Sequence, residues 1–118
     1  MDERVILGVT ERVIVIGNNG LEEEVTARID TGATSSSIDI NLALKLSLGP
    51  VTRLKMVKSA SAVGRRQLIR AKVKINGELM EEEFTLADRA HMTYPLLIGQ
   101  NILKKGNFLI DPHKKVKV

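Results

Sequence analysis

The sequence predicts an all-β domain with one or two short helices. Apolar residues, chiefly Val, Ile and Leu, occur in short runs, and several of these runs alternate with polar residues. β-Branched residues favour strands, and a period of two indicates a strand with one buried face. Helical spacing is confined to Asn41–Leu48 and, more weakly, to Asn101–Lys105. Strands therefore dominate the expected fold.

Turn-forming residues separate the expected strands. Gly17–Gly20 and Asn76-Gly77 are strong turn signals, and Gly49-Pro50 ends the first helical pattern. A run of small residues, Ser59–Gly64, forms the tip of a long hairpin. In chain order, the expected strands are Val5–Leu7, Glu11–Ile16, Leu21–Ile29, an alternation at Ile38 and Ile40, Val51–Val57, Arg66–Ile75, Leu79–Leu86, Pro95–Gly99, Asn107–Pro112 and a strand-like tail at Lys114–Val118.

Length and composition limit the class of protein. A chain of 118 residues fits one domain, residues 1–118, and 43% apolar residues with only 3% aromatic residues predict an aliphatic core. The absence of Cys excludes disulfides, thiolate metal sites and Cys nucleophiles. The start of the chain does not resemble a signal peptide, and no apolar segment is long enough to cross a bilayer. We expect a cytoplasmic protein without membrane contact.

The net charge of +4 is unevenly distributed. Ile40–Gly77 contains nine Lys and Arg residues and no acidic residue, whereas Glu22–Glu24 and Glu81–Glu83 lie on either side. This pattern is typical either of a solvated basic face or of a surface that attracts an anion. The only aromatic residues are Phe84, Tyr94 and Phe108, too few for the stacking surfaces of single-strand nucleic-acid binders. A nucleic-acid-binding β domain is therefore the least favoured of three functional readings.

The stretch from Ala27 to Ser36 contains the candidate catalytic residue. An alternating strand ends at Asp30, and the following Thr31, Gly32 and Ala33 form a turn in which backbone amides lie near the carboxylate. Asp and Gly at the end of a strand usually make only a turn, so this tripeptide is weak by itself.

A second segment strengthens the catalytic interpretation. Leu97-Ile98-Gly99 follows far downstream, with the long hairpin between it and Asp30. Together these features resemble the retropepsin family of aspartic peptidases. The resemblance implies a closed, acid-protease-like β-barrel, in which Leu97, Ile98 and Gly99 pack beside the catalytic loop.

Further segments resemble a group of small bacterial and archaeal retropepsin-like proteins once labelled putative ATP-dependent zinc proteases. These segments are Glu11–Val13, Ala27–Ser35, Gly64–Arg66, Phe84–Arg89, Met92–Gly99 and Phe108–Pro112. Members of that group are associated with ligases that add glutamates to protein tails. The resemblance therefore implies peptide or protein substrates, with acidic or glutamate-tailed proteins as the expected class.

The chemistry constrains the assembly. Peptide hydrolysis by carboxylates needs two of them, one as the base for water and one as the acid for the carbonyl oxygen. The chain has one Asp-Thr-Gly and is too short for two lobes. We expect a C2 homodimer in which Asp30 of each protomer supplies one carboxylate. The resemblance assigns the Thr31 hydroxyl a hydrogen bond to the partner's loop. It also implies a flap over the substrate, with Ser61, Val63, Gly64, Arg65 and Arg66 as its substrate-binding residues.

One departure from the family pattern favours an alternative. Gln100 follows Gly99 where relatives usually carry Arg, and Thr34 stands where retroviral relatives carry the acid that pairs with it. A catalytically inactive binding or dimerisation module with this fold is the second functional reading.

The sequence favours neither a metal nor a cofactor. His91 and His113 are the only histidines, and no zinc-binding motif or glycine-rich phosphate loop occurs. Asp39, Asp88 and Asp111 are expected in turns or helix caps.

Overall fold

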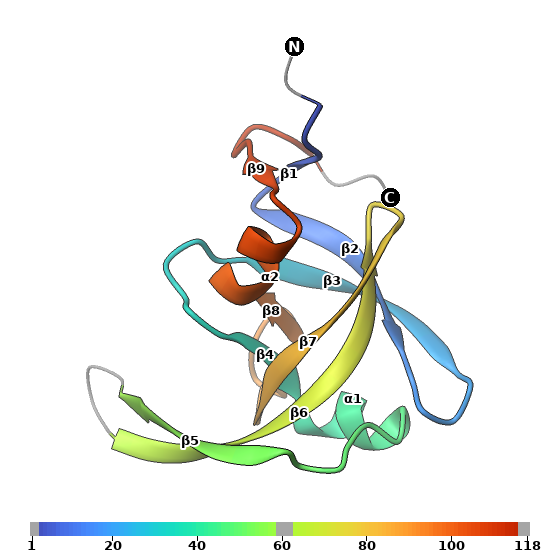
Figure 1. Cartoon of the computed structure of the whole chain (residues 1–118), viewed down its shortest axis with the longest axis vertical. Coiled ribbons are helices and arrows are strands. Elements are labelled where there is room, and N and C mark those ends of the chain that lie inside the picture. Colours follow the sequence, from blue (N-terminus) through green and yellow to red (C-terminus); the bar gives the residue numbers. More distant parts are fainter. Residues whose placement is uncertain (1–2, 59–62, 116–118) are drawn as a thin grey trace.

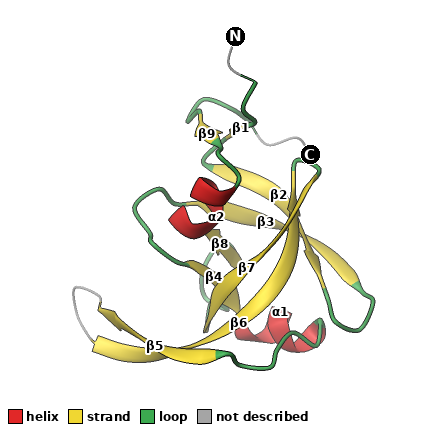
Figure 2. Ribbon diagram, viewed as in Figure 1, coloured by secondary structure: helices red, strands yellow, loops and turns green. Residues whose placement is uncertain are grey.

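Six strands close on one another to form a β-barrel (Figures 1 and 2). The computed structural model describes residues 3–58 and 63–115. The main sheet contains β2 (Thr10–Ile16), β3 (Glu22–Ile29), β4 (Ser36–Asp39), β5 (Arg53–Lys58), β6 (Val63–Ile75), β7 (Glu78–Ala87) and β8 (Leu96–Ile98). Neighbouring strands follow the order β2, β3, β8, β4, β7, β6 and β5, and β6 also pairs with β2, which closes the ring. The predicted all-β barrel is confirmed over the described residues.

The hairpin of β2 and β3 carries the chain to the candidate catalytic residue. Its strands pair antiparallel from Thr10 with Arg28 to Ile16 with Glu22. The predicted turn at Gly17–Gly20 joins them, and Gly20 has a φ of 82°, which favours glycine. β3 therefore ends one residue before Asp30.

β8 lies between β3 and β4 in the barrel wall. It pairs parallel with β3, placing Ile98 beside Ile29, and antiparallel with β4. The end of β3, the start of β4 and the end of β8 are thereby adjacent. The two segments that the sequence analysis singled out, around Asp30 and around Gly99, meet at this point.

The barrel interior is aliphatic, as the composition predicts. Val13, Val15, Val73 and Leu96 are fully buried, and Phe84 is a fully buried aromatic residue. On β6 the predicted alternation holds from residue 69 to residue 75, because the odd-numbered side chains are buried. This packed interior fixes the strand ends that carry the site.

Both helices are short and begin earlier than predicted. α1 (Ile40–Lys45) includes Ile40, which the alternation assigned to a strand. That assignment is wrong, because the Asp39 carboxylate accepts hydrogen bonds from the amides of Asn41 and Leu42 and turns the chain into a helix directly after β4. α2 (Gln100–Lys105) ends at Gly106, as the sequence indicates. None of the helices in the described residues is long and apolar enough to cross a membrane.

The two ends of the described chain meet in a separate small sheet. β1 (Ile6–Leu7) pairs parallel with β9 (Leu109–Ile110). The buried carboxylate of Glu11 accepts hydrogen bonds from the Gly8 amide, at 2.6 Å, and from Lys114 Nζ, at 2.8 Å. Lys114 Nζ also donates to the Ile6 carbonyl. Lys114 and Lys115 are not in a strand, contrary to the prediction for this tail, and residues 116–118 lie outside the described residues.

Part of the acid-free stretch is balanced by its neighbouring strand. In the antiparallel register of β6 and β7, Arg70 lies opposite Glu83 and Lys72 lies opposite Glu81. Opposite charges that face each other across strands attract and reduce the field at a distance. At Arg70 and Lys72, β6 therefore corresponds to the solvated-face interpretation. On the hairpin of β5 and β6, by contrast, Lys55 lies opposite another cation, Arg66.

Candidate active site

The loop after β3 holds Asp30 at the edge of the barrel. The Asp30 amide donates to the Ile98 carbonyl at 2.9 Å, which ties the loop to β8. Asp30 Oδ1 accepts a hydrogen bond from the Gly32 amide at 2.9 Å, and the Ala33 amide donates to the Asp30 carbonyl at 3.3 Å. The side chain is half-buried. One carboxylate oxygen is thus oriented by the loop itself.

Gly99 allows β8 to pass directly beneath this loop. A Cβ added at Gly99 would lie 2.2 Å from the Ser35 carbonyl oxygen and 2.9 Å from that of Ala33. The Gln100 amide donates to the same Ala33 carbonyl at 2.7 Å. Ile98 is fully buried and Leu97 is half-buried. The structure therefore brings the segment Leu97–Gly99 against the loop that starts at Asp30.

Gln100, at the position where the family pattern led us to expect arginine, supports the loop. Its Nε2 donates to the Thr31 carbonyl at 2.8 Å. Thr34 is exposed, and its carbonyl accepts a hydrogen bond from the Asn101 amide at 3.3 Å. Because both positions are uncharged, no buried charge lacks a partner here.

A polar network that the sequence analysis did not find supports the same loop. Ser36 is fully buried, accepts a hydrogen bond from the Gly99 amide at 2.9 Å and donates to Asn101 Oδ1 at 2.7 Å. Asn101 Nδ2 donates in turn to the Glu83 carbonyl at 3.0 Å. The network joins β4, β8, α2 and β7. No local pattern distinguishes Ser36 from the other small polar residues beside it, so its role could not be predicted.

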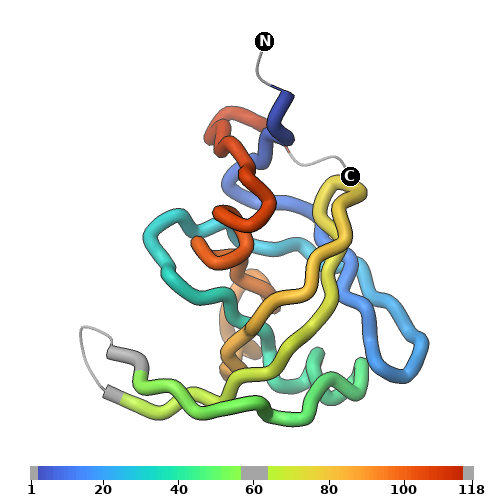
Figure 3. The backbone as a smooth tube through the Cα atoms, in the orientation of Figure 1, coloured from blue at the N-terminus to red at the C-terminus, as the bar shows by residue number. Residues whose placement is uncertain are grey.

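The hairpin of β5 and β6 extends away from the barrel on the side of the Asp30 loop (Figures 1 and 3). Of the residues expected to bind substrate there, Ser61 lies outside the described residues and Val63 is the first residue of β6. Gly64, Arg65 and Arg66 are exposed on β6. The hairpin is called the flap below.

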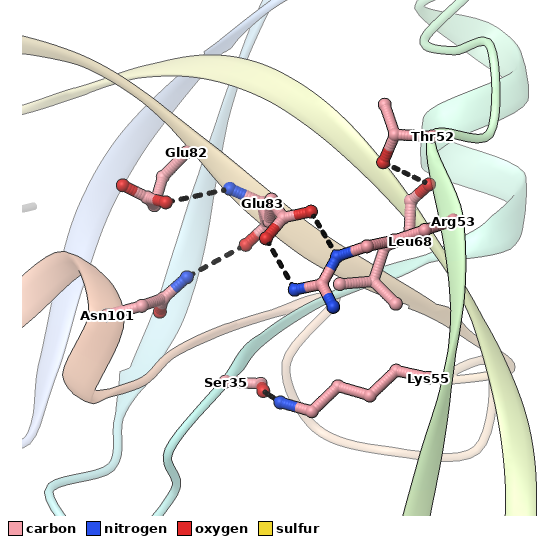
Figure 4. Close-up of polar contacts among 8 residues, drawn as sticks. All are labelled: Ser35, Thr52, Arg53, Lys55, Leu68, Glu82, Glu83 and Asn101. Carbon is pink, nitrogen blue, oxygen red and sulfur yellow. Dashed lines mark hydrogen bonds and ion pairs between the residues drawn. The ribbon is translucent and has the colours of Figure 1, made fainter.

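Two polar contacts fasten the base of the flap (Figure 4). Arg53 donates to Glu83 on β7 through Nε, at 2.9 Å, and through Nη2, at 2.8 Å. Lys55 Nζ donates to the Ser35 hydroxyl at 2.8 Å, which links β5 to the loop that carries Asp30. These contacts join residues far apart in the chain, so no local pattern predicts them.

The Arg53–Glu83 pair makes stability depend on pH. The hydrogen bonds from Arg53 hold the pKa of Glu83 below its usual value, although partial burial opposes this shift. A carboxyl with a lowered pKa in the folded state stabilises the fold at neutral pH, and this contribution is lost as the pH falls through the folded-state pKa. We therefore expect Glu83→Gln to flatten the decline of Tm below about pH 5. Thermal scans across pH check this, with exposed Glu22→Gln as the control, and equal slopes for both variants would contradict it.

A cleft lies between the Asp30 loop, the flap and the segment after β7. Its volume is about 490 Å³. Apolar and polar side chains both contribute, together with the cations Lys55, Arg66 and Arg89 and the carboxylate of Asp88. The lining residues are Gly32, Ala33, Thr34, Ser35, Ser37, Lys55, Met56, Arg66, Thr85, Ala87, Asp88, Arg89, Met92 and Leu97.

A smaller groove adjoins the outer side of the loop. It has a volume of about 340 Å³ and is lined by Thr31, Gln100, Leu103, Lys104, Asn107, Phe108 and Ile110. Thr31, which directly follows Asp30, is exposed and lines this groove.

The other candidate acids have structural partners. Asp39 caps α1, Asp88 Oδ1 accepts from the Ala90 amide, and Asp111 Oδ1 accepts from the His113 amide. These are the predicted turn and cap roles. Within residues 3–58 and 63–115, no group of three or more His, Cys, Asp or Glu side chains could hold a metal ion. His91 and His113 are both exposed.

Comparison with solved structures defines the fold class as that of the retropepsin-like proteases. EIAV protease, solved in complex with the inhibitor HBY-793, aligns with a TM-score of 0.65 and 17% identity over 84% of this chain and 88% of that chain. A retropepsin-like aspartic protease from Rickettsia conorii aligns with a TM-score of 0.50 and 18% identity over 81% and 80% of the two chains. A Legionella pneumophila protein of unknown function, Lpg0085, aligns with a TM-score of 0.67 and 17% identity over 96% and 97%. At these identities the likeness establishes the fold alone.

The family follows from the sequence of the chain itself. The model of the RimB-like family, described as retropepsin-like aspartic endopeptidase RimB, matches residues 42–117, which is more than half of the chain. The protein therefore belongs to the RimB-like family of retropepsin-like aspartic endopeptidases. No curated protein matches the chain. The matched segment begins after Asp30, so it includes β8, α2 and the flap but not the loop that carries the candidate catalytic carboxylate.

Proposed function

We propose that the protein is an aspartic endopeptidase that acts as a C2 homodimer, with Asp30 of each protomer as its catalytic residue. The observation that carries this proposal is the placement of Asp30. Its carboxylate is oriented by the Gly32 amide in a loop that rests on Gly99, beside a cleft that the flap borders. The family and the fold are those of aspartic peptidases.

Two Asp30 carboxylates divide the acid and base work between them. One removes a proton from water, the water oxygen attacks the peptide carbonyl carbon, and the protonated second carboxyl gives its proton to the carbonyl oxygen. In the second half of the reaction, the first carboxyl gives the proton that it took from water to the leaving nitrogen, the second carboxylate removes a proton from a hydroxyl of the diol, and the carbonyl re-forms as the C–N bond breaks. A single Asp30 cannot fill both roles at once, so the monomer is expected to be inactive.

The surface around the loop supports assembly through this face. The groove beside the loop is lined by the half-buried Phe108 and Ile110 and by the loop residue Thr31. Apolar surface beside a site that is incomplete in one protomer suits burial against a second copy.

Activity is expected to depend on protein concentration. Specific activity should rise with concentration as protomers associate and should level off when the dimer is complete. Turnover assays over a dilution series, compared with sedimentation of the same samples, check this. A sedimenting monomer with full activity would contradict the proposed dyad.

We propose acidic peptides as the substrate class. Lys55 and Arg66 lie directly opposite each other on β5 and β6, and both line the cleft. Like charges that face each other across strands are destabilising, and a bound carboxylate between them relieves the repulsion. Of the two flap arginines expected to meet acidic substrate, Arg66 lines the cleft.

Glutamate-tailed peptides should be cleaved in preference to matched glutamine-tailed peptides. A charge-assisted hydrogen bond between a cleft cation and the glutamate carboxylate should raise kcat/KM for the glutamate-tailed peptide by at least about tenfold. Added salt should reduce this preference. Parallel assays at low and high ionic strength check the prediction. Equal turnover of the two peptides would contradict the proposed preference for acidic substrates without contradicting the proposed peptidase activity.

A further inference from the structure

The cleft contains a half-buried arginine, Arg89, to which the proposed chemistry assigns no role. Arg89 follows β7 and lines the cleft together with Gly32 and Ala33 of the Asp30 loop. Among the described residues, no carboxylate forms an ion pair with its guanidinium. The other cations at the flap base differ, since Arg53 is paired with Glu83 and Lys55 bonds to Ser35.

Two hydrogen bonds fix where Arg89 lies. Its amide donates to Asp39 Oδ1 at 2.9 Å, and its Nε donates to the Tyr94 carbonyl at 2.8 Å. The second carboxylate oxygen of Asp39 caps α1, so the arginine is anchored to the barrel rather than to the flap. The two terminal nitrogens of the guanidinium make no hydrogen bond within the described part of the chain.

The position of Arg89 favours an anion in the cleft. Burial lowers the pKa of Arg89, and the nearby Asp39 only partly opposes this shift. A partly desolvated guanidinium with free terminal nitrogens is stabilised by a carboxylate, which it can bind with two parallel hydrogen bonds. Asp88 also lines the cleft, and its Oδ1 accepts a hydrogen bond from the Ala90 amide at 3.1 Å.

We infer that Arg89 binds a carboxylate side chain of the substrate, and that the dimer therefore requires acidic residues on both sides of the cleaved bond. This inference rests on the proposed dimeric peptidase. A two-fold axis between the two Asp30 residues gives each half of an extended peptide its own cleft and its own Arg89. The preferred substrate is thus an acidic run cleaved internally, with one anchored carboxylate on each side of the bond.

The test uses four peptides with the same scissile bond and flanking residues. The first peptide carries glutamate on both sides of this bond, the second only on the N-terminal side, the third only on the C-terminal side and the fourth on neither side. Glutamine stands wherever glutamate is left out. The enzymes are the wild-type protein, Arg89→Met, Arg89→Lys and the control Arg70→Met. Arg70 is exposed on the outer face of the barrel and does not line the cleft. Two quantities are measured. The first is turnover of each peptide by these four proteins. The second is binding of fluorescently labelled forms of the same peptides to the four proteins with Asp30→Asn added.

For the wild-type protein and Arg70→Met, each glutamate replaced by glutamine should reduce kcat/KM about tenfold, and replacing both should reduce it about a hundredfold. Arg89→Met should lose most of this discrimination on both sides of the bond, with the remainder due to Lys55 and Arg66. Arg89→Lys should restore part of it, because the charge remains although the two parallel hydrogen bonds of a guanidinium are lost. A purely structural role for Arg89 would lower activity toward all four peptides equally. Unchanged discrimination in Arg89→Met, or discrimination on one side only, would overturn the inference.

Binding separates this inference from the proposed function. If no peptide is cleaved but binding to the Asp30→Asn proteins depends on Arg89 and on both glutamates, the carboxylate site stands and the peptidase proposal fails. If peptides are cleaved without regard to glutamate, the peptidase stands and the Arg89 site fails.

Discussion

Asp30→Asn is expected to lower kcat for peptide hydrolysis by about 10⁴-fold while leaving a folded dimer. The amide is nearly isosteric with the carboxyl group, and its oxygen can still accept the hydrogen bond from the Gly32 amide. The amide cannot exchange protons with water or with the peptide at neutral pH, so both catalytic roles are lost. Turnover and thermal melting of the purified variant check the two parts of the prediction. Asp111→Asn is the matched control, because Asp111 is an exposed turn residue.

Mixing the two proteins tests whether the site is shared. If each active site takes one Asp30 from each protomer, a re-equilibrated equal mixture of wild-type protein and Asp30→Asn retains about a quarter of the activity of the same total amount of wild-type dimer. A mixture with Asp111→Asn should remain fully active. Retention of half of the activity in the first mixture would mean that each protomer works alone, and unchanged turnover by Asp30→Asn itself would end the aspartic-peptidase proposal.

Gly99→Ala is expected to destabilise the fold by more than about 3 kcal/mol. The new Cβ would lie 2.2 Å from a backbone oxygen of Ser35, and this loop is tied to the barrel by hydrogen bonds at Asp30 and Gln100. Neither strand can move away without breaking these bonds. The φ of Gly99 is −103°, so the expected cost is steric and not conformational. Denaturant unfolding measures it.

Gly64→Ala provides the comparison for the effect of adding a methyl group. A Cβ at Gly64 would meet nothing within 4 Å. Its free energy of unfolding should therefore change by no more than about 1 kcal/mol. Equal stability of the Gly99 and Gly64 variants would show that the loop can separate from β8.

Most strands could be predicted because their pattern is local. Alternation from Ile69 to Ile75 and the turn at Gly17–Gly20 depend only on neighbouring residues. The position of β8 between β3 and β4 could not be predicted from such patterns, since pairing partners leave no trace in the period of a strand. The resemblance to retropepsins predicted only that the segment Leu97–Gly99 packs beside the catalytic loop. The helix start at Ile40 was missed because the cap at Asp39 overrode a continuing alternation.

The candidate site was predicted where a motif marks it and missed where distant residues meet. Asp30 and Gly99 stand in recognisable segments, whereas Ser36 and Asn101 are ordinary polar residues until β4 and α2 come together. The acid-free stretch predicts either a solvated basic face or a surface that attracts an anion, and the structure contains parts that suit each. Its strand β6 lies beside glutamates of β7, and only the cations nearest the flap face the cleft. Arg89 fell within a segment that matched the family, but the sequence assigned it no role.

The pairing of β1 with β9 also bears on the order in which parts of the domain fold. About a hundred residues separate the two strands, and Lys114 must arrive before the buried carboxylate of Glu11 gains its cationic partner. Contacts between such distant segments form late, because closing a long chain segment costs entropy before the contact is made. Until Lys114 joins the fold, the buried carboxylate of Glu11 lacks this partner, so we expect the small sheet of β1 and β9 to be among the last parts of the domain to form.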